Sequence, residues 1–201
     1  MIRAVLFDFD GTLTAPGAID FQAIRLRLCC PSDQPILEYI DRLDPQDQHR
    51  ALDILEAMEL EAARRSRPNT GALELLLWLK HIRIPFGLLT RNGPNSVYLT
   101  LTTFKEISAR DFGVIVTRAE APPKPDPAGV LLAAARLSVD PREILFVGDY
   151  RFDVIAGHRA GSLTAFLSNG KPLSWIPGDP EPHYTIHRLL ELKSIIRPRP
   201  D

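Results

Sequence analysis

Short apolar runs alternate with longer helical patterns over most of this 201-residue chain. Five of the runs are rich in strand-forming residues and are typical of strands buried on both faces. They cover residues 2–7, 84–89, 113–116, 144–147 and 163–167. Helices are predicted between them over 71–82, 94–105 and 127–137, the last two opened by proline, which suits a first helical turn. Strands alternating with helices predict an α/β fold of three layers around a doubly wound parallel sheet.

Residues 15–67 interrupt this alternation. The segment contains no convincing buried strand, whereas 36–43 and 46–65 have the spacing of amphipathic helices. We therefore expect a discontinuous core of residues 1–14 and 68–201, with a small helical cap of residues 15–67 inserted after the first strand. An insert at this position can form a lid over the carboxyl ends of the strands, where open α/β sheets carry their sites.

Composition and charge exclude several classes of protein. The 24 Lys+Arg and 25 Asp+Glu nearly cancel, so the chain lacks the basic excess that binding to nucleic acid or an anionic membrane requires. Hydrophobic residues make up 45%, too many for a disordered chain, and no apolar run approaches the roughly 18 residues of a membrane helix. The apolar start is also too short for a signal peptide, which predicts a cytoplasmic protein with neither nucleic acid nor membrane as partner.

The only two cysteines, Cys29 and Cys30, are adjacent, so a disulfide framework is not expected. They are interpreted as small buried or half-buried thiols. The oligomeric state, monomer or dimer, is left open by the sequence.

Acidic residues directly follow two of the predicted strands. Asp8 and Asp10 come after the first strand, and in extended backbone this spacing points both side chains to the same side. Two close carboxylates are unfavourable unless a cation joins them, and oxygen ligands suit Mg²⁺. Asp149 and Asp153 follow the fourth strand, where Asp149 could complete a cation site. The alternatives are a surface turn at Asp10-Gly11 and a helix N-cap at Asp149.

Two further polar groups lie beyond strand ends. The second strand ends in Thr90-Arg91-Asn92, whose hydroxyl, backbone amides and amide side chain could hold an anion. Lys124 lies in a stiff stretch between prolines, which suits a fixed positive charge beside acids or phosphate. A strand-exit cap and an exposed loop lysine are the alternatives. Since parallel strands place their carboxyl ends at one edge, all four clusters can converge on one crevice.

In their order along the chain, the four clusters resemble the four motifs of the haloacid dehalogenase-like hydrolase superfamily. The matching residues are Asp8-x-Asp10-Gly11-Thr12, Thr90, Lys124 and Gly148-Asp149-x-x-x-Asp153. The first and fourth motifs are specific, whereas the second and third are recognised by position. The resemblance spans residues 5–169 and implies a Rossmann-like sheet and a Mg²⁺-dependent phosphatase that acts on a small phosphorylated metabolite through an aspartyl-phosphate.

The resemblance implies a role for each matching residue. Asp8 would be the nucleophile, and Asp10 would protonate the leaving oxygen and then activate water. Mg²⁺ would bind the Asp8 carboxylate, the Asp10 backbone carbonyl and Asp149, with Asp153 supporting the metal through water or orienting Lys124. The residues expected to hold the phosphoryl group are Gly11, Thr12, Thr90, Arg91, Asn92 and Lys124.

Details of the sequence indicate which branch of the superfamily the chain resembles. Dehalogenases lack the second acid, which is present here as Asp10, and phosphonatases use a cap lysine, whereas residues 15–70 contain none. The insert resembles the first-type helical cap of phosphoglycolate phosphatases and β-phosphoglucomutases, although it is short. Within it, Arg25 and Arg27 could meet a substrate carboxylate or second phosphate, or simply form a solvated helix face.

Three hypotheses about function follow from this resemblance. The leading one is a phosphatase of the phosphoglycolate phosphatase-like branch. A phosphomutase of the β-phosphoglucomutase kind is the alternative, which the short, lysine-free cap disfavours. A non-enzymatic binding protein on the same fold is the third, disfavoured because the acids and the lysine of the motifs are all present.

Overall fold

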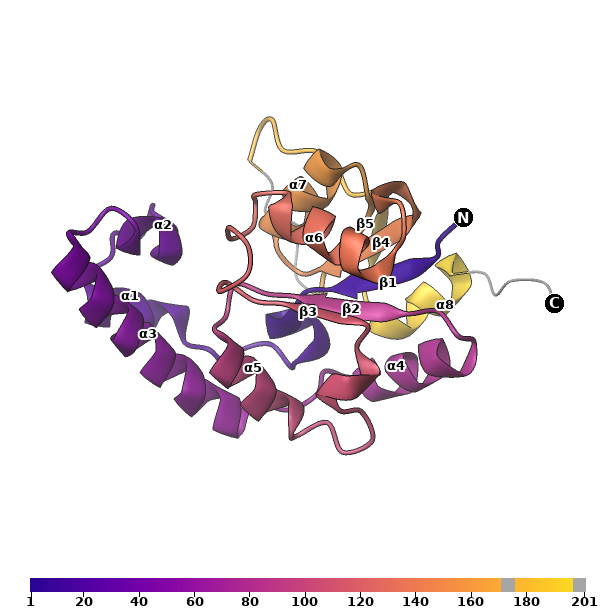
Figure 1. Ribbon diagram of the computed structural model, residues 1–201, viewed down its shortest axis with the longest axis horizontal. Helices are drawn as coiled ribbons and strands as arrows, with labels where there is room; N and C mark the ends of the chain where they lie inside the picture. The colour runs from indigo at the N-terminus through magenta and orange to yellow at the C-terminus, as the bar shows by residue number, and fades with distance from the viewer. Residues whose placement is uncertain (171–175, 197–201) are drawn as a thin grey trace.

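The computed structural model describes residues 1–170 and 176–196 and contains one six-stranded sheet (Figure 1). Neighbouring strands are parallel throughout, in the order β3-β2-β1-β4-β5-β6. The strands are β1 (Ala4–Phe7), β2 (Phe86–Leu89), β3 (Val114–Val116), β4 (Ile144–Gly148), β5 (Leu163–Leu167) and β6 (Tyr184–Ile186). Because the chain winds outward from β1 in both directions, the predicted doubly wound α/β fold is confirmed.

Helices cover both faces of the sheet (Figure 1). One face packs against α4 (Ala72–His81), α5 (Pro94–Leu101) and α8 (Leu192–Ile195), and the other against α6 (Ala128–Leu137) and α7 (Arg151–Ala160). The short turns are η1 (Phe9–Leu13), η2 (Ala109–Asp111), η3 (Pro141–Glu143) and η4 (Leu189–Glu191). Across residues 1–170 and 176–196, none of the helices combines the length and apolarity needed to cross a membrane.

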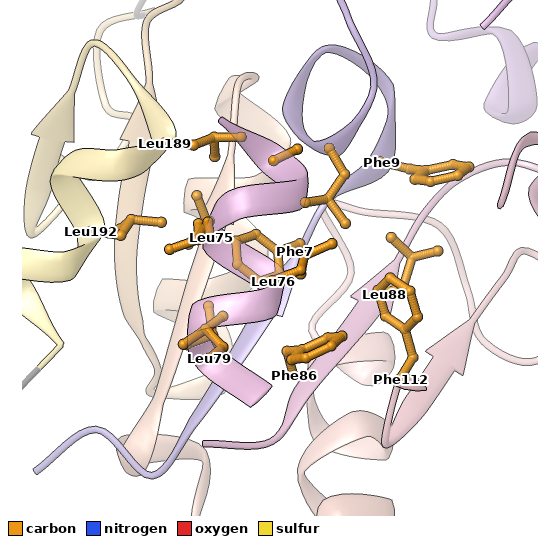
Figure 2. Packing of buried hydrophobic residues seen from close by; sticks show 14 of the residues in the cluster. Phe7, Phe9, Leu75, Leu76, Leu79, Phe86, Leu88, Phe112, Leu189 and Leu192 are labelled. Carbon is orange, nitrogen blue, oxygen red and sulfur yellow. The ribbon is translucent and has the colours of Figure 1, made fainter. Parts of the chain in front are cut away.

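Successive side chains of the central strand β1 point to opposite faces of the sheet, so the core has two layers. Val5 and Phe7 of β1 face α4, while Ala4 and Leu6 face α6. Figure 2 shows the first layer, in which Leu75, Leu76 and Leu79 of α4 pack beside Phe7 and Phe86 of the sheet. Each fully buried side chain of this kind contributes about 1.5–3 kcal/mol. The apolar faces therefore hold the sheet rigid and leave its carboxyl edge free to carry polar residues.

The sixth strand, β6, is not predicted by the sequence. It has only three residues, and the first two, Tyr184 and Thr185, are exposed, so it lacks the apolar run that marks the other strands. Its residues pair with Ala165, Phe166 and Leu167 of β5. Pairing with an existing strand edge, rather than a local pattern, defines this strand.

The segment between β1 and α4 forms three helices, α1 (Phe21–Leu28), α2 (Ile36–Ile40) and α3 (Pro45–Arg65). Figure 1 shows them extending beyond the sheet at one side of the molecule. They share an apolar cluster of their own that includes Ile24, Ile40 and Leu55. At its two ends the segment is tied together by the Ala15 N–H, which donates to the Arg67 carbonyl at 2.8 Å.

A buried carboxylate fixes α3 against the helix α5. Glu59 of α3 forms an ion pair with Arg118 at 2.5 Å and accepts hydrogen bonds from the Gly93 N–H at 3.1 Å and the Ser96 hydroxyl at 3.3 Å. Burial raises the pKa of Glu59, and Arg118 opposes that rise. Since Gly93 is the residue before α5, the carboxylate also accepts a hydrogen bond from a backbone N–H at the start of that helix.

Truncation of Leu75 tests the packing of α4 on the sheet. Leu75 is 0% exposed, so we expect Leu75→Ala to reduce the free energy of unfolding by about 2–5 kcal/mol, because it removes buried surface and leaves a cavity. Urea unfolding followed by circular dichroism measures the change. Leu26→Ala is the matched control, since Leu26 is 75% exposed, and it should change stability by no more than about 0.5 kcal/mol. Equal effects of the two substitutions would contradict the described core.

Candidate functional site

The polar clusters of the sequence meet at the carboxyl edge of the sheet. Asp8 follows β1, Thr90 follows β2 and Asp149 follows β4, and these three strands are neighbours. The Asp8 N–H donates to the Val147 carbonyl at 2.8 Å, which extends the pairing of β1 and β4 up to the acid itself. Asp8, Asp10, Thr90, Lys124 and Asp149 all line a cavity of about 500 Å³.

Lys124 is buried between two of the acids. Its Nζ donates to Asp8, to Asp153 Oδ1 at 2.6 Å and to the Leu89 carbonyl at 3.2 Å. Burial alone would lower the pKa of Lys124, but the charges of Asp153 and Asp8 outweigh it and hold that pKa above its ordinary value. The ammonium group is therefore fixed in its charged form beside Asp8.

Three carboxylates gather around this lysine. Oxygen atoms of Asp8, Asp149 and Asp153 all lie within 4.8 Å of one another. Burial, and then the charge of Asp8, raises the pKa of Asp149 to about 8. Burial also raises the pKa of Asp153 to about 6, although Lys124 opposes that rise. The high proton affinity of these carboxyls reflects their burial together with the negative charge that they share, and an all-oxygen donor set fits a hard divalent cation such as Mg²⁺.

Asp10 lies apart from these three carboxylates. Its Oδ2 accepts a hydrogen bond from Asn92 Nδ2 at 2.6 Å. Burial, followed by the charge of Asp8, raises the pKa of Asp10 to about 7, and the bond from Asn92 opposes the rise. A carboxyl group that titrates near neutrality is suited to donate and accept protons in turn.

Only glycine fits at position 11, because of both its backbone conformation and its close neighbours. Its φ of 78° lies in the left-handed region, and a Cβ at this position would lie 2.1 Å from Asp149 Oδ2. Thr12, the next residue, donates from Oγ1 to Asp8 Oδ2 at 3.4 Å. Only glycine lets the η1 backbone pass this close to the acid at the end of β4.

Two asparagines that the sequence interpretation missed hold the η1 turn. Asn69 Nδ2 donates to the Thr12 carbonyl at 2.9 Å and to the Gly11 carbonyl at 3.3 Å, and Asn169 Nδ2 donates to the Gly11 carbonyl at 2.7 Å. Asn169 follows β5 at the same edge of the sheet, so its position after a strand was an available signal. Asn69 comes just after the three-helix segment, and nothing local in the sequence indicates its role.

The side chains of the Thr90-Arg91-Asn92 segment have different partners. Thr90 is buried, and its Oγ1 accepts from the Asn92 N–H at 3.1 Å. Arg91, expected to help hold phosphate, directs its guanidinium to Glu38 of α2, with contacts of 2.6 Å and 3.0 Å, and also donates to the Lys124 carbonyl. The structure thus brings the Arg91 side chain to a carboxylate of the three-helix segment.

Arg25 and Arg27 of α1 occupy different positions. Arg25 lines the cavity, but its Nη1 donates to the Pro31 carbonyl at 2.7 Å and to the Gln34 carbonyl. Arg27 is exposed and is not among the described residues that line the cavity. Of the two arginines suggested for substrate contact, the structure brings only Arg25 to the cavity.

Comparison with known proteins defines the class of protein. A family model for haloacid dehalogenase-like hydrolases matches residues 2–161, most of the chain. An uncharacterized hydrolase of Saccharomyces cerevisiae is 32% identical over 197 residues, covering 97% of this chain and 84% of that protein. The chain therefore belongs to the haloacid dehalogenase-like hydrolases, as its motifs predict.

Two further likenesses come from proteins with more specific descriptions. N-acetylmuramic acid 6-phosphate phosphatase of Pseudomonas aeruginosa is 30% identical over 188 residues, covering 84% of this chain and 83% of that protein. A crystal structure described as a predicted phosphoglycolate phosphatase from Haemophilus somnus has a TM-score of 0.74 at 20% identity, covering 96% of this chain and 97% of that one. The second likeness is one of fold.

The carboxylate cluster predicts a pH-dependent response to Mg²⁺. The pKa values of Asp149 and Asp153, about 8 and about 6 against an ordinary 3.8, mean that the folded protein binds protons more tightly than the unfolded chain. Their contribution to stability without metal is therefore complete below pH 3.8 and is lost as the pH rises through about 6 to 8. Mg²⁺ requires ionised ligands, so it should raise the melting temperature more at a pH of about 8 than at about 5.5.

Thermal unfolding with and without Mg²⁺ at both pH values measures this difference. Asp149→Asn should abolish most of the Mg²⁺-dependent rise in melting temperature. Asp53→Asn, at an exposed position on α3, is the matched control and should keep the rise. An undiminished response in Asp149→Asn would show that Mg²⁺ binds elsewhere.

Proposed function

We propose that this protein is a Mg²⁺-dependent phosphatase that hydrolyses a small phosphorylated metabolite through an aspartyl-phosphate. The observation that carries the proposal is the surroundings of Asp8, whose carboxylate lies beside the buried Lys124 ammonium and within 4.8 Å of Asp149 and Asp153 oxygens. A hydrolase family and a relative named as a phosphatase support it. Phosphoryl transfer depends on positioning and charge neutralisation, which this arrangement supplies.

In the first half of the proposed reaction, an Asp8 oxygen attacks phosphorus and the bond from phosphorus to the leaving oxygen breaks. Asp10 gives its proton to that oxygen, so the leaving group departs as an alcohol. Lys124 offsets the negative charge of Asp8 and of the approaching phosphoryl group. Thr90 and the backbone amides near it hold the phosphoryl oxygens.

In the second half, Asp10 takes a proton from water, and the water oxygen attacks phosphorus. The bond between phosphorus and Asp8 then breaks, which releases inorganic phosphate and restores the carboxylate. The side chains of Asp8, Asp149 and Asp153, with the Asp10 carbonyl, would hold Mg²⁺. When bound, the metal neutralises charge shared by the nucleophile and the phosphoryl oxygens.

The proposal assigns residues 15–67 as a cap and residues 1–14 with 68–201 as the catalytic core. Hydrolysis is favoured over phosphomutase activity because large side chains that line the cavity, Phe21 and Tyr150, remain exposed to water. A phosphomutase needs a lid that excludes water from the aspartyl-phosphate. Interconversion of hexose phosphates without release of phosphate would reverse this ranking.

Replacement of the nucleophile is the first test of the mechanism. Asp8→Asn should lower kcat for p-nitrophenyl phosphate by about 10³-fold or more, because the amide cannot form the covalent intermediate. Release of p-nitrophenol in the presence of Mg²⁺ measures the rate. Asp53→Asn makes the same chemical change at an exposed position and should leave the rate unchanged. Normal turnover by Asp8→Asn would rule out an aspartyl-phosphate at this residue.

Replacement of Asp10 tests the proton transfer separately. Asp10→Asn should lower kcat by about 10²–10⁴-fold for an alkyl phosphate, whose alkoxide leaving group needs a proton. The loss should be smaller for p-nitrophenyl phosphate, because p-nitrophenolate leaves readily without one. Measuring both substrates with both proteins gives the comparison, and an equal loss on the two substrates would assign Asp10 a structural role instead.

A further inference from the structure

Exposed apolar side chains line the same cavity as the nucleophile. Phe21, Tyr150 and Ile176 are 55%, 53% and 55% exposed, and all three line the cavity that contains Asp8. They come from separate parts of the chain: the start of α1, the residue before α7, and the connection between β5 and β6. Apolar side chains left exposed around a cavity with a few convergent polar groups are typical of a surface that a ligand covers.

Two arginines that line the cavity are already held by carboxylates. Arg91 contacts both oxygens of Glu38, and Arg151 contacts both oxygens of Asp179 at 2.6 Å and 2.5 Å. Their guanidinium carbons also lie 5.2 Å and 5.4 Å from the centre of the Phe152 ring. Such two-point pairs are specific in geometry and strong, so a second anion on the substrate would have to displace a protein carboxylate to reach either arginine.

The remaining charges also disfavour a second anion. Lys124 is held by Asp8 and Asp153, and the Arg25 Nη1 is directed to carbonyl groups of its own loop. Among the described residues that line the cavity, each arginine already donates to a protein group, and Asp33 is an acid outside the catalytic cluster. A carboxylate or second phosphate in the leaving group would therefore gain no unpaired arginine and would meet the charge of Asp33.

The size of the cavity points to a leaving group larger than a two-carbon acid. Its volume of about 500 Å³ lies within the range of about 300–1,000 Å³ that is typical of small-molecule binding sites. Phe21 and Tyr150 offer aromatic surface, which packs well against the flat face of a ring. A short anionic chain would leave this apolar surface exposed to water.

We propose that the site selects phosphate monoesters whose leaving group is an uncharged alcohol that carries a ring, in preference to leaving groups with a carboxylate or a second phosphate. This inference rests on the phosphatase function proposed above. Phe21, Tyr150 and Ile176 receive the ring, and the Arg91–Glu38 and Arg151–Asp179 pairs discriminate against a second anion. On this proposal, the likeness to phosphoglycolate phosphatases reflects membership of the same branch of the family, whereas the cavity selects a different substrate.

Two matched pairs of substrates test charge and ring separately. 2-Phosphoglycolate and 2-hydroxyethyl phosphate differ by a carboxylate in place of an uncharged hydroxymethyl group, whereas 2-phenoxyethyl phosphate adds a ring to the latter without adding charge. We expect kcat/KM to rise about tenfold from the first to the second and about tenfold again to the third, as lost repulsion and buried apolar surface each act in turn. Glucose 6-phosphate and adenosine 5′-monophosphate then distinguish a sugar-sized leaving group from a nucleoside.

Two variants connect the selectivity to named residues. Tyr150→Ala should bring the ratio of kcat/KM for 2-phenoxyethyl phosphate over 2-hydroxyethyl phosphate close to one. Tyr98→Ala is the matched control, because Tyr98 is 51% exposed on α5 and does not line this cavity, so it should keep the ratio. Glu38→Gln releases the Arg91 guanidinium and should raise kcat/KM for 2-phosphoglycolate relative to 2-hydroxyethyl phosphate.

The outcomes separate the two proposals. A higher kcat/KM for 2-phosphoglycolate than for 2-hydroxyethyl phosphate in the unaltered protein would overturn the charge selection. An unchanged ring preference in Tyr150→Ala would overturn the assignment of the ring-binding surface. If p-nitrophenyl phosphate and every ester of the set stay intact with Mg²⁺ present, the phosphatase function itself fails, and the substrate class falls with it.

Discussion

The structure depends on one electrostatic constraint: buried carboxylates at the carboxyl edge of the sheet outnumber the buried ammonium group that they share. Asp8 and Asp153 bind Lys124, whereas the described residues form no such ion pair with Asp149, and burial together with the charge of Asp8 raises the pKa of Asp149 to about 8. Proteins tolerate such a deficit where a cation or an acidic proton completes the site. The core supplies the rigidity that this requires, because both faces of β1 are packed against helices and the acids cannot move apart.

The sequence predicted the parts of the fold and site that have a local signature. Short apolar runs marked β1, β2, β3, β4 and β5, and the acids after β1 and β4 were expected to meet because strand ends share one edge of a parallel sheet. Lys124 is far from both acid pairs in sequence, and its role was indicated by its stiff setting between prolines and by its place among the motifs. The structure brings it to Asp8 and Asp153, as that position implies.

The features that were missed depend on tertiary structure. β6 exists through pairing with β5, and Asn69 and Asn169 act on the Gly11 carbonyl from positions 58 and 158 residues away. The Arg91 side chain illustrates the same limit. Its neighbours in sequence suggested that it binds phosphate, whereas it pairs with the Glu38 carboxylate, which lies 53 residues away in α2. Local chemistry identifies which residues are polar, and packing decides which of them meet.

The two kinds of ion pair around the cavity differ in their access to solvent, and ionic strength therefore affects them differently. Lys124 and its acids are buried, so dissolved salt cannot enter between them and screening by counterions is weak. Arg91 and Glu38 are partly exposed, so counterions reach them and weaken their attraction as salt increases. The nucleophile is thus insulated from the surrounding electrolyte, while the contact that joins α2 to the loop after β2 responds to it.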